Sequence, residues 1–184
     1  MRKAIAALFC LAVLAVSAQA AEVTGRFRLV AQDGRTVTER SFDGRVRMVT
    51  FGYTFCPDIC PTTLNTMAGA LELLGPKARE VVGLFVTVDP ARDTAAHLRD
   101  YVDAFGPGFV GLTGSREAVD EAARAFRVRY VLNPPMDAAD PNTYFVDHTA
   151  GIYVMDRQGQ FVAKLGHRAE PDEVAARLIE VLER

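Results

Sequence analysis

The residues of this sequence best suited to chemistry are two cysteines. Cys56 and Cys60 are separated by Pro57, Asp58 and Ile59, and each cysteine is followed by a proline. Because a thiolate is both a nucleophile and a metal ligand, the pair could be a structural disulfide, a redox pair or part of a metal site. A disulfide between residues four positions apart closes a small loop and removes little unfolded-state entropy, so a purely structural bond would stabilise the fold little.

The spacing of the cysteines favours metal over redox chemistry but leaves both open. Residues i and i+4 of a helical turn have Cβ atoms about 5–6 Å apart, whereas a disulfide requires about 3.8 Å. A metal ion with sulfur bonds of about 2.3 Å can span the wider gap. If the segment is a loop, both geometries are possible. In the redox interpretation, Cys56 would attack a client disulfide and Cys60 would resolve the resulting mixed disulfide.

A metal site needs more than two thiolates, and three histidines are candidates. His97 borders the apolar face of a predicted helix, and His167 follows Gly166 at the end of a predicted strand, so we interpret both as structural or solvent-facing residues. His148, in FVDHT, follows a long polar loop. From its position alone, it is equally well interpreted as a metal ligand or as an ordinary polar residue at the start of a strand.

Two cysteines and one histidine form a set soft enough for copper. A structural zinc ion would need a fourth ligand, and no third cysteine lies outside the N-terminal segment. Asp58 and Asp147 could support the ligands through hydrogen bonds, although solvated carboxylates are an equal interpretation. Of the methionines that could add a thioether, Met67 and Met155 lie in core-facing patterns, whereas Met136 lies in the polar loop.

The N-terminal segment predicts export. Residues 1–20 begin with Arg2 and Lys3, continue as an apolar run and end in the small-x-small site 18–20, the pattern of a cleavable signal peptide. Cys10 belongs to this segment. The apolar run is shorter than the roughly 20 residues that span a bilayer, so an uncleaved inner-membrane tether is the alternative interpretation.

The charge balance excludes one class of partner. The 184 residues include 21 Lys plus Arg and 23 Asp plus Glu, a net charge of −2, and loss of Arg2 and Lys3 takes it to −4. A mildly acidic chain without a cationic run gives no reason to expect nucleic-acid binding. We expect residues 21–184 to form a single exported, soluble periplasmic domain.

The hydrophobic pattern predicts an α/β sandwich with a central mixed sheet, preceded by an N-terminal hairpin with a two-residue turn at Asp33-Gly34. Asp89–Thr94 is interpreted as a turn and helix cap. Because the cysteines lie where a buried strand passes into a helix, the layout is thioredoxin-like. The other predicted elements are strands over 45–52, 81–88, 109–113 and 128–132, helices starting at Pro61, Thr94, Ser115 and Pro171, and a C-terminal hairpin of 149–155 with 160–165.

Four blocks of the sequence together resemble the SCO/SenC family, thioredoxin-like (peroxiredoxin-like) copper-binding proteins of cytochrome c oxidase assembly. The blocks are TFCPDICPTTL, VTVDPARDT, GLTGSREAVDEAARAFRVRY and VDHTAGIYVMDRQGQF. The resemblance implies that Cys56, Cys60 and His148 bind copper(I) or copper(II), with Asp58 and Asp147 as supporting groups.

The same resemblance implies a metallochaperone that delivers copper to the binuclear copper centre of the oxidase. Its partners would be the copper-receiving oxidase subunit, a thiol reductase that keeps Cys56 and Cys60 reduced, and an upstream periplasmic copper donor. The alternative function is a thiol:disulfide oxidoreductase acting through a redox-active Cys56–Cys60 disulfide. A peroxidase is a third interpretation, because related peroxidases share the thioredoxin-like layout.

Overall fold

A computed structural model describes residues 22–184, so the predicted signal peptide over 1–20 lies outside the described residues. The chain forms a seven-stranded sheet in the order β2-β1-β5-β4-β3-β8-β9 and a separate two-stranded sheet of β6 and β7. The strands are β1 (Arg28–Ala31), β2 (Thr36–Thr38), β3 (Val46–Gly52), β4 (Val81–Thr87), β5 (Phe109–Thr113), β6 (Tyr130–Leu132), β7 (Val146–His148), β8 (Ile152–Met155) and β9 (Phe161–Leu165). The helices are α1 (Ile59–Leu74), α2 (Ala95–Asp103), α3 (Arg116–Ala125) and α4 (Pro171–Leu182), with 3-10 helices η1 (Glu39–Phe42) and η2 (Gly75–Glu80).

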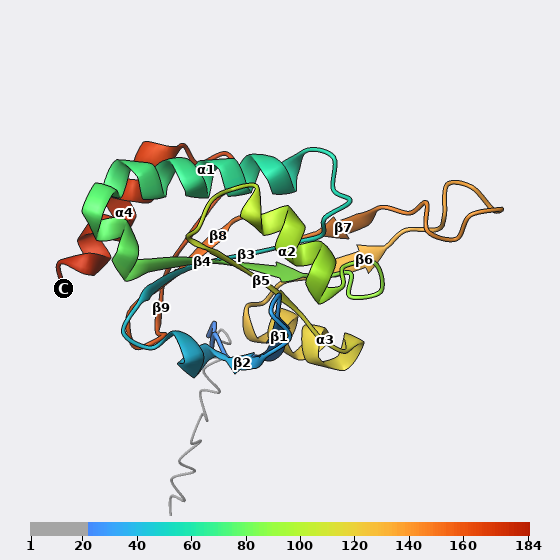
Figure 1. Ribbon diagram of the computed structural model, residues 1–184, viewed down its shortest axis with the longest axis horizontal. Coiled ribbons are helices and arrows are strands. Elements are labelled where there is room, and N and C mark those ends of the chain that lie inside the picture. Colours follow the sequence, from blue (N-terminus) through green and yellow to red (C-terminus); the bar gives the residue numbers. More distant parts are fainter. Residues whose placement is uncertain (1–21) are drawn as a thin grey trace, which may run out of the picture.

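The large sheet is mixed, which confirms the predicted fold class. β3 runs parallel to β4 and β4 to β5, whereas β8 pairs antiparallel with β3 and β1 antiparallel with β5. α1 and α4 pack together over one face, and α3 lies on the opposite face beside β1 (Figure 1). Every residue of β3 and β4 is buried, as expected for central strands covered on both faces.

Three predicted local features are confirmed and one is wrong. Thr94 and Ser115 cap α2 and α3 by accepting hydrogen bonds from the backbone N–H groups of His97 and Ala118, both at 3.2 Å. The N-terminal hairpin is present, but its loop has three residues, because Ala31 pairs with Arg35 through a 2.9 Å hydrogen bond. Gly34 ends that loop with φ of 85°, a left-handed conformation that suits the longer turn.

The predicted strand over 149–155 is also wrong in its extent. The chain forms two strands, β7 and β8, separated by residues 149–151. Gly151 has φ of 130°, and a Cβ there would lie 2.5 Å from the Leu165 carbonyl oxygen, so this position between the two strands suits only glycine. His148 therefore lies in β7, opposite Tyr130 of β6, and not in the loop that enters β8.

The β6–β7 hairpin and the 133–145 connection between its strands project from the end of the large sheet (Figure 1). Across residues 22–184 no helix is both long and apolar enough to cross a membrane.

Candidate metal centre

The two cysteines lie on either side of the start of α1. The helix was expected from Pro61 but begins at Ile59, which places Cys60 in its first turn and Cys56 in the loop after β3. The Cys56 N–H donates to the Tyr53 carbonyl oxygen at 3.2 Å. Cys60 is 3% exposed. We call residues 53–58 the cysteine loop.

The third member of the site comes from a distant part of the chain. The sulfur atoms of Cys56 and Cys60 and a ring nitrogen of His148 all lie within 4.8 Å of one another. His148 Nε2 lies 3.4 Å from Cys60 Sγ, and Nδ1 lies 3.4 Å from the Thr149 carbonyl oxygen. With a proton on Nδ1, donated to that carbonyl, Nε2 could offer its lone pair to a metal ion shared with the sulfur atoms. In the metal-free protein, a ring N–H of His148 is the donor toward Cys56.

The two thiols have opposite protonation behaviour. A hydrogen bond from the Cys60 thiol lowers the pKa of Cys56 well below that of a free thiol, and His148 and the backbone N–H groups of Asp58 and Cys60 act in the same direction, against burial. The same sulfur–sulfur contact, together with burial, raises the pKa of Cys60. Cys56 is therefore the thiolate of the pair and Cys60 the proton donor.

These three donors fit one soft metal ion. Two ligand atoms bound to one ion at about 2.3 Å lie at most about 4.6 Å apart, close to the separations in this cluster. Thiolate and imidazole together suit copper, and three protein donors leave a coordination position open. Within residues 22–184, this is the one group of three or more His, Cys, Asp or Glu side chains in metal-binding proximity.

The other predicted candidates do not join the three-residue cluster. Asp58 is exposed at the start of α1, and Asp147 is exposed and accepts a 3.2 Å hydrogen bond from Asn133. Neither carboxylate belongs to the cluster. Met67 and Met155 are buried in the core, whereas Met136 is exposed, and His97 and His167 are exposed outside the cluster.

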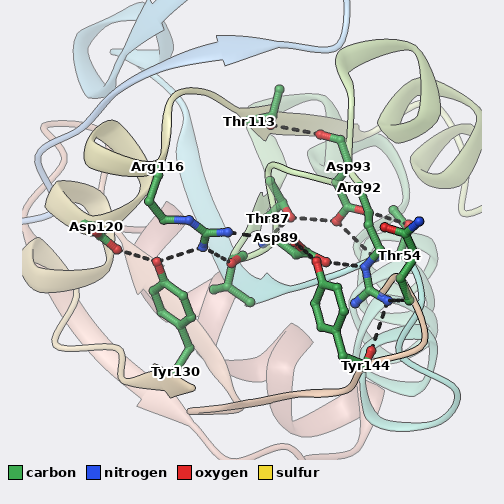
Figure 2. A network of polar contacts seen from close by, with 12 residues as sticks. Thr54, Thr87, Asp89, Arg92, Asp93, Thr113, Arg116, Asp120, Tyr130 and Tyr144 are labelled. Atoms are coloured by element: carbon green, nitrogen blue, oxygen red, sulfur yellow. Dashed lines mark hydrogen bonds and ion pairs between the residues drawn. The ribbon is translucent and has the colours of Figure 1, made fainter. Parts of the chain in front are cut away.

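Sequence reasoning missed a set of buried polar residues next to the cysteine loop. Asp89 and Asp93 have no exposed surface, although 89–94 was predicted only as a turn and cap. The Asp93 carboxylate accepts hydrogen bonds from the Thr54 N–H, the Thr54 hydroxyl and the Thr87 hydroxyl at 3.1, 2.6 and 2.6 Å, and so ties the cysteine loop to the end of β4 (Figure 2). The available signal was two aspartates and an arginine directly after a buried strand.

Comparison with known proteins identifies the family. The profile described as SCO1/SenC matches residues 15–183. The chain belongs to the SCO1/SenC family. Among the relatives of this SCO1/SenC chain, Protein SenC of Rhodobacter capsulatus is 37% identical over 155 residues, covering 84% of this chain and 68% of that protein. Protein sco1 of Schizosaccharomyces pombe is 36% identical over 155 residues, and the match spans 84% of this chain but only 59% of the yeast protein.

Solved structures of the family share this fold. Bradyrhizobium japonicum ScoI with copper bound is 39% identical and superposes with a TM-score of 0.77, covering 86% of this SCO1/SenC chain and 98% of that one. Yeast Sco1 with copper bound is 33% identical, with a TM-score of 0.80 and coverage of 89% and 90%. The likeness supports the predicted thioredoxin-like architecture.

Proposed function

We propose that this SCO1/SenC protein is an exported copper chaperone that holds one copper ion through Cys56, Cys60 and His148. It would pass the ion to the binuclear copper centre of cytochrome c oxidase. The observation that carries the proposal is the cluster of two sulfur atoms and one imidazole nitrogen within 4.8 Å. The copper-bound structures of the Bradyrhizobium and yeast relatives support it.

The protonation of the cysteines suits a site that loads and releases its cargo. The Cys56 thiolate can bind a cation without first losing a proton, because its pKa is lowered. Cys60 must lose its proton on loading, and the charge of the cation favours that loss. Since Cys56 and His148 are only partly buried, an incoming thiolate or imidazole could displace one ligand at a time.

Three partners follow from this function. A copper-receiving oxidase subunit would accept the ion, and an upstream periplasmic donor would supply it. A thiol reductase would keep Cys56 and Cys60 as the free thiols that the structure shows, because a disulfide between them would remove two of the three ligands.

Transfer between purified proteins tests this function. Reduced, copper-loaded protein is mixed with the metal-free soluble domain of an oxidase copper-receiving subunit, and the spectrum of its copper centre is followed. We expect the acceptor to fill while the chaperone empties, and Cys60→Ser to transfer far less. Tight copper binding with no transfer to the acceptor would contradict the chaperone function while leaving the metal site intact.

A second function, thiol:disulfide oxidoreductase, is favoured by the free thiolate of Cys56 beside a protonated Cys60. The Cys56 sulfur would attack a client disulfide, forming a mixed disulfide and releasing one client thiolate. Cys60, after losing its proton, would attack Cys56, forming the Cys56–Cys60 disulfide and releasing the second client thiolate. Client reduction that survives His148→Ala but stops in Cys56→Ser, with a trapped mixed disulfide in Cys60→Ser, would establish this activity.

A further inference from the structure

Arg92 contacts aromatic rings from both segments that carry the proposed ligands. Its guanidinium carbon lies 4.7 Å from the ring centroid of Phe55 and 5.5 Å from that of Tyr53, both in the cysteine loop. It also lies 3.6 Å from the ring centroid of Tyr144, which precedes His148 by four residues. The Arg92 side chain is only 8% exposed, so this stack is largely sheltered from water.

Hydrogen bonds fix the same arginine to the segment that leads into β7. Arg92 Nη1 donates to the carbonyl oxygens of Asn142 and Tyr144 at 2.8 and 2.9 Å. Its Nε donates to the buried carboxylate of Asp89, which also accepts the Tyr144 hydroxyl at 2.8 Å (Figure 2). Both the backbone and the side chain of Tyr144 are therefore held against the end of β4.

The partner strand of β7 is anchored to the same aspartate. Tyr130 lies opposite His148 in the β6–β7 register, and its hydroxyl contacts Asp120 and, at 3.0 Å, Arg116 Nη1. Arg116 Nη2 lies 3.9 Å from Asp89. Tyr144, which precedes β7, contacts the buried Asp89 carboxylate directly, and Tyr130 of β6 is linked to the same carboxylate through Arg116 (Figure 2).

These contacts matter because the large sheet does not hold β7. Its strand partner in the described chain is β6, and the pair forms a sheet of its own. Ladder hydrogen bonds therefore cannot fix the distance between His148 and the cysteine loop. That loop has additional anchors of its own, in Asp93 and in the buried β3 and α1.

We propose that Arg92 is the positioning residue that sets His148 against Cys56 and Cys60. It would act through His148, the ligand on the projecting hairpin, and not on the cysteines. A lysine could keep the charge but not the planar fork that donates to three acceptors while stacking on aromatic rings. The proposal rests on the ligand set proposed above and is independent of whether the copper is delivered to an oxidase.

A double-mutant cycle with His148 tests the proposal. Copper(II) affinity is measured by competition titration for Arg92→Ala and Arg92→Lys, each in the wild-type and His148→Ala backgrounds. Loss of a residue that orients a metal ligand typically weakens binding about 10–100-fold. We expect that loss for Arg92→Ala, a smaller loss for Arg92→Lys, and almost no further loss when His148 is already absent.

Two further measurements separate positioning from general damage. Arg157→Ala is the matched control, because Arg157 also bridges two segments, bonding Glu80 and the Leu182 carbonyl, but away from the site. We expect it to leave copper(II) affinity unchanged. In the metal-free protein, amide hydrogen exchange over 144–148 should rise in Arg92→Ala while exchange in β3 and α1 stays constant.

The results that would overturn the proposal are specific. Unchanged copper(II) affinity in Arg92→Ala would show that Arg92 does not position a ligand. An equal loss in the wild-type and His148→Ala backgrounds would show that it acts on the fold and not through His148. If Arg92→Ala weakens copper(II) binding only when His148 is present, and yet the protein transfers no copper to the acceptor, the positioning role is supported and only the chaperone function is contradicted.

Discussion

At the scale of single residues, the two cysteines are not equivalent. Cys60 is buried in the first turn of α1 and keeps its proton, whereas Cys56 is partly exposed and is the thiolate. The lowered pKa of Cys56 comes mainly from its interaction with the Cys60 thiol, and Cys60 is also the more buried of the two. Cys56 is therefore the first sulfur to meet an incoming cation or disulfide, and Cys60 loses its proton and reacts after it.

This asymmetry predicts a pH dependence for alkylation of the reduced, metal-free protein. Because the pKa of Cys56 is lowered, its thiolate should persist as the pH falls from 8 to 5, so its rate with iodoacetamide should change little. Because the pKa of Cys60 is raised, that thiol should stay protonated and unreactive over the same range. Mass spectrometry of timed samples measures both rates. A Cys56 rate that drops about tenfold per pH unit below 8 would contradict the assignment.

Gly52 is a second residue on which the site depends. A Cβ at this position would lie 2.6 Å from Cys60 Sγ and 2.9 Å from the Phe85 ring. Gly52→Ala should therefore lower the free energy of unfolding by about 1–3 kcal/mol, the usual cost of overpacking, and weaken copper binding by displacing Cys60. Denaturant unfolding and copper titration measure the two effects.

Gly166→Ala is the control for that substitution, because an added Cβ there meets no atom within 4 Å. It should change neither the free energy of unfolding nor the copper affinity. If Gly52→Ala behaved like this control, Cys60 would not be as tightly confined as the structure indicates.

At the scale of elements, the sequence was sufficient wherever a pattern is local. Continuous apolar runs predicted β3 and β4, and capping residues predicted the starts of α2 and α3, because burial and capping depend on neighbouring residues. The strand over 128–132 was predicted and contains β6, but β7 and its pairing with β6 were not, since β7 has three residues and the hairpin is held by side chains from other elements. His148 was named as a ligand from resemblance, because nothing local distinguishes it.

The buried acidic turn after β4 was missed for a related reason. Asp89 and Asp93 look like ordinary turn and cap residues, and their roles depend on partners 39 to 55 positions away in sequence, Thr54 and Tyr144. The parallel pairing of β3 and β4 brings Thr54 beside Asp93 at one edge of the sheet, whereas Tyr144 reaches Asp89 from outside that sheet. Only the fold reveals that the turn fixes both ligand-bearing segments.

Residues 135–141, the outer part of the connection between β6 and β7, should not contribute to ligand positioning. The hydrogen bonds of residues 136–140 in the described chain stay within 136–143. Replacing 135–141 with Asn-Gly should leave copper affinity unchanged and the free energy of unfolding within about 1 kcal/mol, because loop-closure entropy varies slowly with length. Titration and denaturant unfolding measure both quantities, and a tenfold loss of affinity would show that the whole connection orients His148.

At the scale of the whole molecule, the parallel strands bring the site together. The cysteine loop follows β3 and the acidic turn follows β4, so both emerge at the carboxyl edge of neighbouring strands, where α/β folds commonly place their functional groups. The hairpin that carries His148 joins them from outside the large sheet (Figure 1). The proposed metal site is therefore complete only when the whole fold is formed.

The central claim, that Cys56, Cys60 and His148 together bind one copper ion, is tested most directly by anaerobic copper titration of the reduced protein. Wild-type protein should bind one equivalent. Cys56→Ser, Cys60→Ser and His148→Ala should each weaken binding and change the spectrum of the bound copper. His167→Ala, which alters an exposed histidine outside the cluster, should match the wild type. Wild-type stoichiometry, affinity and spectrum in His148→Ala would contradict the claim.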